Sequence, residues 1–198
     1  YSKIELTYQK KPSCPKMINN ICNYIPRTEL IITKLIPLYE EGRCILILSD
    51  RRNHLLEIEI LLKKYNIECG YYVGGMKPQA LRDAQEKNVI LGTFSMASEG
   101  MDIPKLNTII LASPKSDVVQ AVGRIMREKA NVRKFHPLII DINDTHSNFQ
   151  TFKRQNIKRI TFYNKQKYKI YLHKTDGLIE EYKKVRKSKI AKQGVCLI

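Results

Sequence analysis

The sequence predicts an α/β fold in which helices flank a mainly parallel sheet. Between residues 43 and 142, short apolar runs alternate with helical patterns at regular spacing, and this alternation is typical of a parallel sheet. The runs are continuously apolar, as expected of strands that are covered on both faces. With 198 residues, 43% of them hydrophobic, the chain can bury one full core, so we expect one main domain.

Five segments of this region have the length and apolarity of strands. They are residues 43–48, 69–73, 88–94, 106–112 and 135–141. Apolar runs of this length are far too short to cross a bilayer, so we predict no membrane partner.

Three helices are expected between these strands. The first follows a cap at Ser49 or Asp50 and has an apolar stripe at three- and four-residue steps, formed by Leu55, Ile58, Leu62 and Tyr65. The second covers residues 78–87 and begins with a proline, which suits a first helical turn. The third covers residues 116–128, with an aspartate in its first turn.

The N-terminal segment is expected to belong to the same domain. Residues 1–42 are predicted to supply a strand at 3–8 and two linking helices at 15–24 and 27–41. Residues 43–145 then form the domain core. Because the chain begins with tyrosine rather than methionine, we also expect it to be a piece excised from a longer protein.

The pattern changes after the core. Residues 146–198 are predicted to form a basic C-terminal extension with a polar helix at 146–155. A hairpin follows, with strands at 160–163 and 167–172, because these segments are rich in β-branched and aromatic residues. A lysine-rich helix at 176–192 completes the chain.

The positive charge is concentrated in this extension. The formal net charge of the chain is +16, and residues 142–198 carry 14 lysines and arginines against four acidic residues. A basic extension beside a less charged domain is typical of a protein with a polyanionic partner, most often nucleic acid. A merely solubilising, lysine-rich surface is the alternative.

Neither the cysteines nor the histidines have the spacing of a metal site. The five cysteines include no C-x-x-C pair, which favours buried thiols in a reducing compartment. The four histidines are scattered along the chain. We therefore predict no metal site.

A loop-like pattern, TFSMASEGMDIP, occupies residues 93–104. Thr93 ends a predicted strand, Glu99 and Gly100 form a turn, and Asp102 follows. Loops at the carboxyl ends of parallel strands are the usual binding edge of such sheets. Glycine permits close approach of a ligand, and an exposed aspartate can accept hydrogen bonds from a ribose hydroxyl. A plain turn without a ligand is the alternative.

A second pattern, QAVGRIMRE, occupies residues 120–128 of the third expected helix. Gln120, Arg124 and Arg127 are four and three residues apart, so we expect them to project from one face. Two arginines there would make a phosphate clamp, because guanidinium groups match phosphate oxygens and keep their charge. An amphipathic helix with solvated arginines is the alternative.

A glycine pair ends the second expected strand, just before Lys77. A turn at Gly74 and Gly75 can let a nucleic-acid strand approach the backbone, with Lys77 adding a phosphate contact. A simple tight turn explains these residues equally well. The sequence contains no G-x-x-x-x-G-K-[ST] phosphate loop, so we predict that this chain alone does not hydrolyse a nucleotide.

Together these motifs make the chain resemble the second RecA-like domain of a superfamily 2 helicase. The similar segments are residues 45–52 (motif IV), 93–104 (motif V) and 120–127 (motif VI). Residues 73–77 and 113–127 especially resemble helicases of large cytoplasmic DNA viruses, including the poxvirus transcript-release type. The resemblance covers roughly residues 40–145 and implies a RecA-like fold and a viral, intracellular protein of the host cytoplasm or the virion.

The resemblance also implies which residues meet the nucleotide. Arg127 is the implied arginine finger and Arg124 its companion on the phosphates, while Gln120 couples the nucleotide to closure of the motor. The implied neighbours of the nucleotide on the motif V loop are Glu99, Gly100 and Asp102. ATP and Mg²⁺ are implied to be held mainly by an N-terminal RecA-like domain in cis.

The same resemblance implies a nucleic-acid track. Thr93, Ser49 and Arg51 would contact the nucleic-acid backbone, and we add Gly75 and Lys77 to them from the glycine turn. DNA is favoured over RNA as the partner. A non-catalytic RecA-like module that binds nucleic acid is the alternative function, whereas a Rossmann-type enzyme is disfavoured because no G-x-G-x-x-G follows the first strand.

Overall fold

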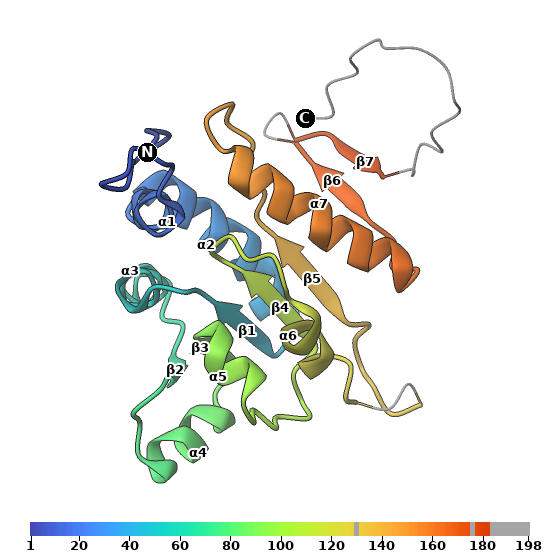
Figure 1. The fold of residues 1–198 in the computed structure, drawn as a ribbon. Helices are drawn as coiled ribbons and strands as arrows, with labels where there is room; N and C mark the ends of the chain where they lie inside the picture. The colour runs from blue at the N-terminus through green and yellow to red at the C-terminus, as the bar shows by residue number, and fades with distance from the viewer. Residues whose placement is uncertain (129–130, 175–176, 183–198) are drawn as a thin grey trace.

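A five-stranded sheet forms the centre of the structure (Figure 1). This computed structural model describes residues 1–128, 131–174 and 177–182. The strands are β1 Ile45–Leu48, β2 Cys69–Tyr72, β3 Val89–Gly92, β4 Thr108–Leu111 and β5 Leu138–Asp141. Their order is β2-β3-β1-β4-β5, and every neighbouring pair is parallel. The predicted α/β class and all five predicted strands are confirmed.

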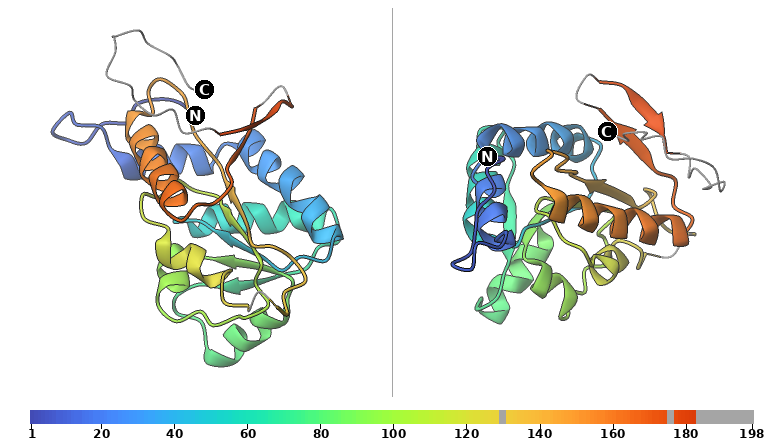
Figure 2. Two further views of the ribbon diagram at one scale, coloured as in Figure 1. Left: turned by 90° about the vertical axis from the view of Figure 1, so that its right-hand side faces the viewer. Right: turned by 45° about the horizontal axis from the view of Figure 1, so that its top comes forward.

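Helices cover both faces of this sheet. On one face lie α2 Ile25–Glu40 and α3 Arg52–Lys63. On the other face lie α4 Pro78–Glu86, α5 Phe94–Ser98, α6 Val119–Arg124 and α7 Gln150–Lys165. Figure 2 shows the blue and cyan helices α2 and α3 on the opposite side of the sheet from the green helices α4 and α5. The result is the three-layered arrangement of a RecA-like domain.

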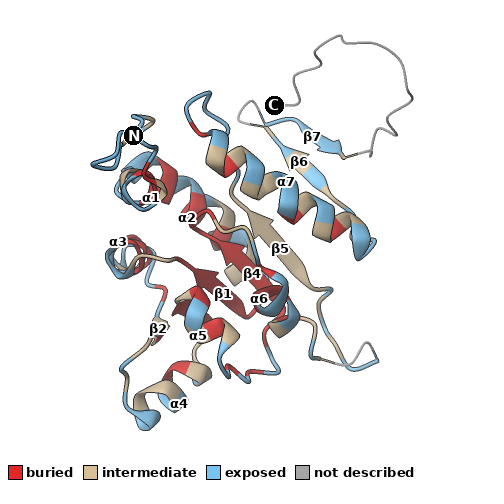
Figure 3. Ribbon diagram, in the orientation of Figure 1, coloured by how far each residue is buried: buried red, intermediate tan, exposed pale blue. Residues whose placement is uncertain are grey.

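Alternate residues of the central strands serve the two cores. In β1, Leu46 and Leu48 pack with the α5 and α6 side, whereas Ile45 and Ile47 pack with the α2 and α3 side. All four side chains are fully buried, and Figure 3 shows the burial running along β1 and β4. This double coverage explains why the strands are continuously apolar in sequence.

Helices α3 and α4, which lie between strands, form close to where the apolar stripe and the proline of the sequence predict them. In α3, Leu55, Ile58 and Leu62 are fully buried, as the predicted stripe requires. Tyr65, the fourth predicted member, lies beyond the end of the helix and is exposed. Pro78 occupies the first turn of α4, where its missing N–H costs no helical hydrogen bond. Helix α5 was not predicted, because its five residues are too few to show a period.

Helix α1 (Cys14–Cys22) packs against the start of α7. Its Met17 and Ile21 pack against Phe149 and Phe152 at the start of α7 in a separate buried cluster. The N-terminal and C-terminal segments therefore share a core of their own, beside the one on the sheet.

The predicted strand at residues 3–8 is wrong. This segment has only an isolated antiparallel bridge between Leu6 and Pro12. Leu6 and Ile4 are exposed, and the backbone of this segment bonds to its own turn, for example from Ser13 N to Glu5 O at 2.7 Å. The apolar residues of this segment thus join neither core.

The predicted C-terminal hairpin is misplaced. Residues 160–163 are helical, because α7 runs on through them and buries Phe152 and Tyr163 on its inner side. The hairpin that exists pairs β6 Tyr171–His173 with β7 Ile179–Glu181 in antiparallel register. The predicted helix at 176–192 is therefore wrong at 179–181, and its remainder from residue 183 onward lies outside the described residues.

Four of the five cysteines can be placed, and all four are free thiols. Cys22 and Cys44 are buried, Cys14 and Cys69 are half-buried, and Cys196 lies outside the described residues. Burial raises the pKa of Cys69 to about 11, so its thiol stays protonated at neutral pH. Within the described ranges, no helix has the length and apolarity needed to cross a membrane.

Candidate functional site

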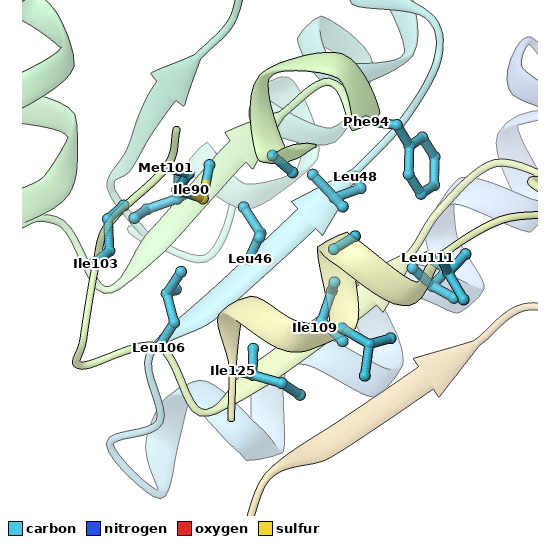
Figure 4. Packing of buried hydrophobic residues seen from close by; sticks show 14 of the residues in the cluster. Leu46, Leu48, Ile90, Phe94, Met101, Ile103, Leu106, Ile109, Leu111 and Ile125 are labelled. Atoms are coloured by element: carbon cyan, nitrogen blue, oxygen red, sulfur yellow. The ribbon is translucent and has the colours of Figure 1, made fainter. Parts of the chain in front are cut away.

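The predicted motif V loop leaves the sheet through α5, which follows β3 directly, and returns to it before β4. Met101 and Ile103 of this loop are buried in the core with Leu106 (Figure 4). Asp102, which lies between the two buried residues, is exposed, and so is Gly100, whose φ of +132° favours glycine. The alternation of buried and exposed residues therefore anchors the loop and presents its polar members to solvent.

Arg124 fastens this loop to α6. Its guanidinium donates three hydrogen bonds to backbone carbonyls, from Nε to Ala97 O at 2.6 Å, from Nη2 to Ser98 O at 2.7 Å and from Nη1 to Met101 O at 2.7 Å. Burial and the charge of Arg127 lower the pKa of Arg124, but a guanidinium remains charged at any physiological pH. All three of its nitrogens are thus occupied by the protein itself. We call this arrangement the Arg124 clasp.

Arg127 does not lie on the same helix face as Arg124, contrary to the prediction. Helix α6 is shorter than expected and ends at Arg124, with Ile125 as its C-cap. Arg127 lies beyond this end and forms an ion pair with Asp102. The predicted arginine finger and the predicted ribose-binding aspartate are therefore brought together, and both are at least partly exposed. Gln120 is exposed on α6.

Several predicted nucleic-acid contacts gather where β2, β3 and β1 end side by side. Thr93 precedes α5, and its hydroxyl lies 3.2 Å from that of Ser95. Gly75 has a φ of +83° and is exposed, and Lys77 is the exposed N-cap of α4. Because parallel strands end at one edge of the sheet, these groups share that edge.

Arg52, which the sequence interpretation missed, links two of the segments at this edge. Its Nη2 donates to Gly74 O at 2.5 Å, and so the start of α3 is tied to the glycine turn after β2. Its position next to Arg51 was the only signal for it in the sequence.

Ser49 and Arg51 face the protein rather than the edge. Ser49 is fully buried, and its hydroxyl accepts a hydrogen bond from Arg51 N at 3.2 Å. The Arg51 guanidinium donates to Asn19 Oδ1, and to Pro15 O at 3.0 Å. In this conformation the Ser49 hydroxyl is buried and cannot reach a ligand, and two of the Arg51 guanidinium nitrogens donate to residues of α1.

Behind the ends of β1 and β4 lies a buried polar group of four side chains, Arg27, Ser49, His54 and Asp144, which we call the polar anchor. Arg27 donates to both carboxylate oxygens of Asp144, at 2.7 and 2.8 Å, and to Ala112 O at 2.6 Å. His54 Nδ1 lies 3.1 Å from the Ser49 hydroxyl. Burial, assisted by the Arg27 charge, lowers the pKa of His54 to about 3, so the ring is neutral. Sequence reasoning singled out only Ser49 of this group, as a nucleic-acid contact, and missed the group itself because Arg27 and Asp144 are far apart in the chain.

The residues of the site fit a phosphate better than a metal ion. An exposed guanidinium, Arg127, lies beside a loop whose Gly100 leaves room for a ligand, since a Cβ there would meet nothing within 4 Å. In the ranges that the structure describes, no three histidine, cysteine or acidic side chains are grouped to hold a metal. The described residues therefore offer a donor for a phosphate but no ready-made cluster of protein ligands for a metal.

Comparison with known proteins identifies relatives among viral helicases. Residues 27–129 match the family model of the helicase conserved C-terminal domain. A candidate ATP-dependent RNA helicase of Acanthamoeba polyphaga mimivirus is 40% identical over 166 residues, which cover 81% of this chain and 31% of that protein. A candidate ATP-dependent RNA helicase of African swine fever virus is 29% identical over 118 residues, which cover 58% of this chain and 21% of that protein.

A solved structure shares the fold. The crystal structure of T4 UvsW matches 80% of this chain and 36% of its own, with a TM-score of 0.61 and 20% identity. The chain spans about a third or less of the length of each of these relatives. The motifs, the layered sheet and the family match agree, and the chain belongs to the helicase conserved C-terminal domain family.

Proposed function

We propose that this chain is the C-terminal motor domain of an ATP-dependent nucleic-acid helicase or translocase. The observation that carries the proposal is the Arg124 clasp, because it joins motif V to motif VI through three hydrogen bonds. Asp102 and Arg127 therefore belong to one unit on the surface of the domain. Such a unit can carry an arginine to a phosphate when two domains close on each other.

In this proposal the two arginines have different roles. Arg127 is the arginine finger, and Arg124 is a positioning residue that holds the motif V loop in place. Arg127 reaches a phosphate by leaving Asp102, and exposed ion pairs of this kind stabilise by only about 0–1 kcal/mol. Asp102 is then free to accept a hydrogen bond from the nucleotide, beside Gly100 and Glu99.

ATP, held mainly by an N-terminal RecA-like domain in cis, would supply the phosphoryl group whose transfer drives the motor. Gln120 would couple its presence to closure of the domains. The protein ligands of Mg²⁺ belong to that other domain in our proposal. This chain by itself is then expected to hydrolyse no ATP.

The proposed partner is a nucleic-acid strand that runs over the edge formed by Thr93, Gly75 and Lys77. Arg51 lies next to this edge, and Ser49 contributes by orienting the backbone of Arg51. DNA was favoured from the sequence, but the two viral relatives are named for RNA, so we include RNA as a substrate. The viral and intracellular setting remains part of the proposal.

Replacement of Arg127 in the intact protein tests the proposal. We expect Arg127→Ala to lower nucleic-acid-stimulated ATP hydrolysis by about 10³- to 10⁵-fold, the range known for arginine fingers, with little loss of nucleic-acid affinity. The matched control is Arg82→Ala, because Arg82 is exposed on α4 and, among the described residues, its side chain bonds only to Gln79.

Two results would contradict the proposal. If Arg127→Ala hydrolysed ATP as fast as Arg82→Ala, the finger assignment would be lost. If the intact protein hydrolysed no ATP at all but bound nucleic acid, the non-catalytic binding module would be the better assignment.

A further inference from the structure

A hollow of about 450 Å³ lies between α1 and the start of α3. It is lined by Asn19, Asn23, Asp50, Arg51, Arg52 and Asn53. Two of these residues come from α1 and its C-cap, which precede residue 27, where the match to the helicase domain begins. The hollow therefore combines a part of the matched family domain with a helix that lies outside the match.

The charges in the hollow are only partly neutralised. The Asp50 carboxylate is paired with Lys115, at 3.2 Å from each oxygen, and so it repels an anion less than a free carboxylate would. Arg51 donates to α1, whereas Arg52 is an exposed residue and donates from Nη2 to Gly74 O. The hollow thus offers guanidinium donors to an anionic group.

Asparagine amides form the rest of the lining. Across the part of the chain that the structure describes, the Asn23 and Asn53 amides have no hydrogen-bond partner, whereas Asn19 accepts from Arg51. An amide both donates and accepts, while a phosphate can only accept. Sugar hydroxyls and base edges present donors as well as acceptors, so a hollow with arginine and free amides suits a whole nucleotide rather than a bare phosphate.

The position of the hollow agrees with this ligand. Arg52 bonds to Gly74, the neighbour of Gly75, so the hollow continues the edge on which the nucleic-acid strand is proposed to run. We infer that the hollow binds one nucleotide of that strand, with Arg52 on its phosphate and Asn23 and Asn53 on its sugar or base. This inference rests on the proposed function and assigns α1 a place in the track.

Binding of a short, fluorescein-labelled single-stranded oligo(U) to the chain, followed by fluorescence anisotropy at several salt concentrations, tests the inference. We expect Asn23→Ala and Asn53→Ala each to weaken binding by up to about tenfold, the equivalent of one hydrogen bond. The salt dependence should not change, because no charge is removed. Arg52→Ala should instead lower the slope of log K against log salt by about 0.7, as the loss of one phosphate contact does on a single strand.

Asn156→Ala is the matched control, because Asn156 lies on α7, outside the hollow. Circular dichroism checks that all the variants are folded. If folded Asn23→Ala and Asn53→Ala bound the strand as tightly as Asn156→Ala, the hollow would be excluded as a nucleotide site while the proposed function would stand. If the unchanged chain bound no strand even at low salt, the nucleic-acid partner itself would be contradicted, and the hollow with it.

Discussion

The polar anchor lies behind the ends of β1 and β4, and the motif V loop follows β3, the neighbour of β1. The two regions use polar residues in opposite ways. In the polar anchor, Arg27 and Asp144 are nearly fully buried and satisfy each other. In the motif V loop, the backbone is held by the Arg124 clasp, and Asp102 faces solvent. The charged groups of the first region are buried and pair with each other, whereas those of the second form an ion pair that solvent can reach. Residue type alone therefore does not separate structural from functional arginines in this fold.

The largest effect is expected from breaking the polar anchor. Asp144→Ala leaves the buried Arg27 charge without its carboxylate, and such changes destabilise proteins by about 3–5 kcal/mol. Urea unfolding of the chain, followed by circular dichroism, measures this loss. The change should be global, because Arg27 lies on α2 and Asp144 follows β5.

The matched control for Asp144→Ala is Glu41→Ala. Glu41 is paired with Arg43 but is half exposed, so its removal should change the free energy of unfolding by about 0–1 kcal/mol. Equal effects of the two substitutions would mean that the polar anchor does not support the fold, and the contrast between the two regions would fail.

A smaller effect is expected from opening the Arg124 clasp. Arg124→Ala removes three charge-assisted hydrogen bonds from a partly exposed site, and we expect a loss of about 2 kcal/mol. Amide hydrogen exchange should become faster mainly in residues 97–102, since this loop would lose its attachment to α6.

Arg127→Ala is the comparison for this substitution, because Arg127 has a single exposed ion pair and should change stability by about 0.5 kcal/mol or less. If Arg124→Ala left the exchange of residues 97–102 unchanged and only weakened nucleotide binding in the intact protein, Arg124 would be a phosphate companion of Arg127, as the sequence suggested.

The sheet could be predicted from the sequence because each strand lies between two apolar layers and must itself be apolar. Residues 160–163 misled the same reasoning, since their β-branched and aromatic side chains favour strands locally. Packing decides otherwise, because Phe152 and Tyr163 are spaced to bury one side of a helix. The composition of residues 160–163 alone does not reveal these tertiary contacts.

The sequence singles out members of the candidate site but not the contacts that they make. The motif loop, Asp102 and Arg127 could be found because they are distinctive residues at fixed spacing. The contacts of Arg124 could not be predicted, because its partners are backbone carbonyls, which every residue carries. The same holds for Ser49, whose burial depends on His54 and on a helix from another part of the chain.

The smallest effect concerns pH and should separate the two regions once more. The pKa of His54 in the folded protein is about 3, well below its ordinary value of 6.5. Between these values the unfolded chain binds a proton that the folded chain does not, so stability is full above pH 6.5 and falls as the pH decreases. Between pH 7.5 and 5.5 we expect a loss of about 1.4 kcal/mol in the free energy of unfolding.

His54→Gln should remove this part of the pH dependence, whatever it does to stability at neutral pH, because glutamine does not titrate. His136→Gln is the control, since His136 is exposed and lies outside the polar anchor. The measurement is the change in urea unfolding free energy between the two pH values for each protein. If His54→Gln kept the pH dependence of the unchanged chain, another group would have to bind the proton. If the dependence disappears only in that variant, the buried polar anchor is the pH-sensitive region.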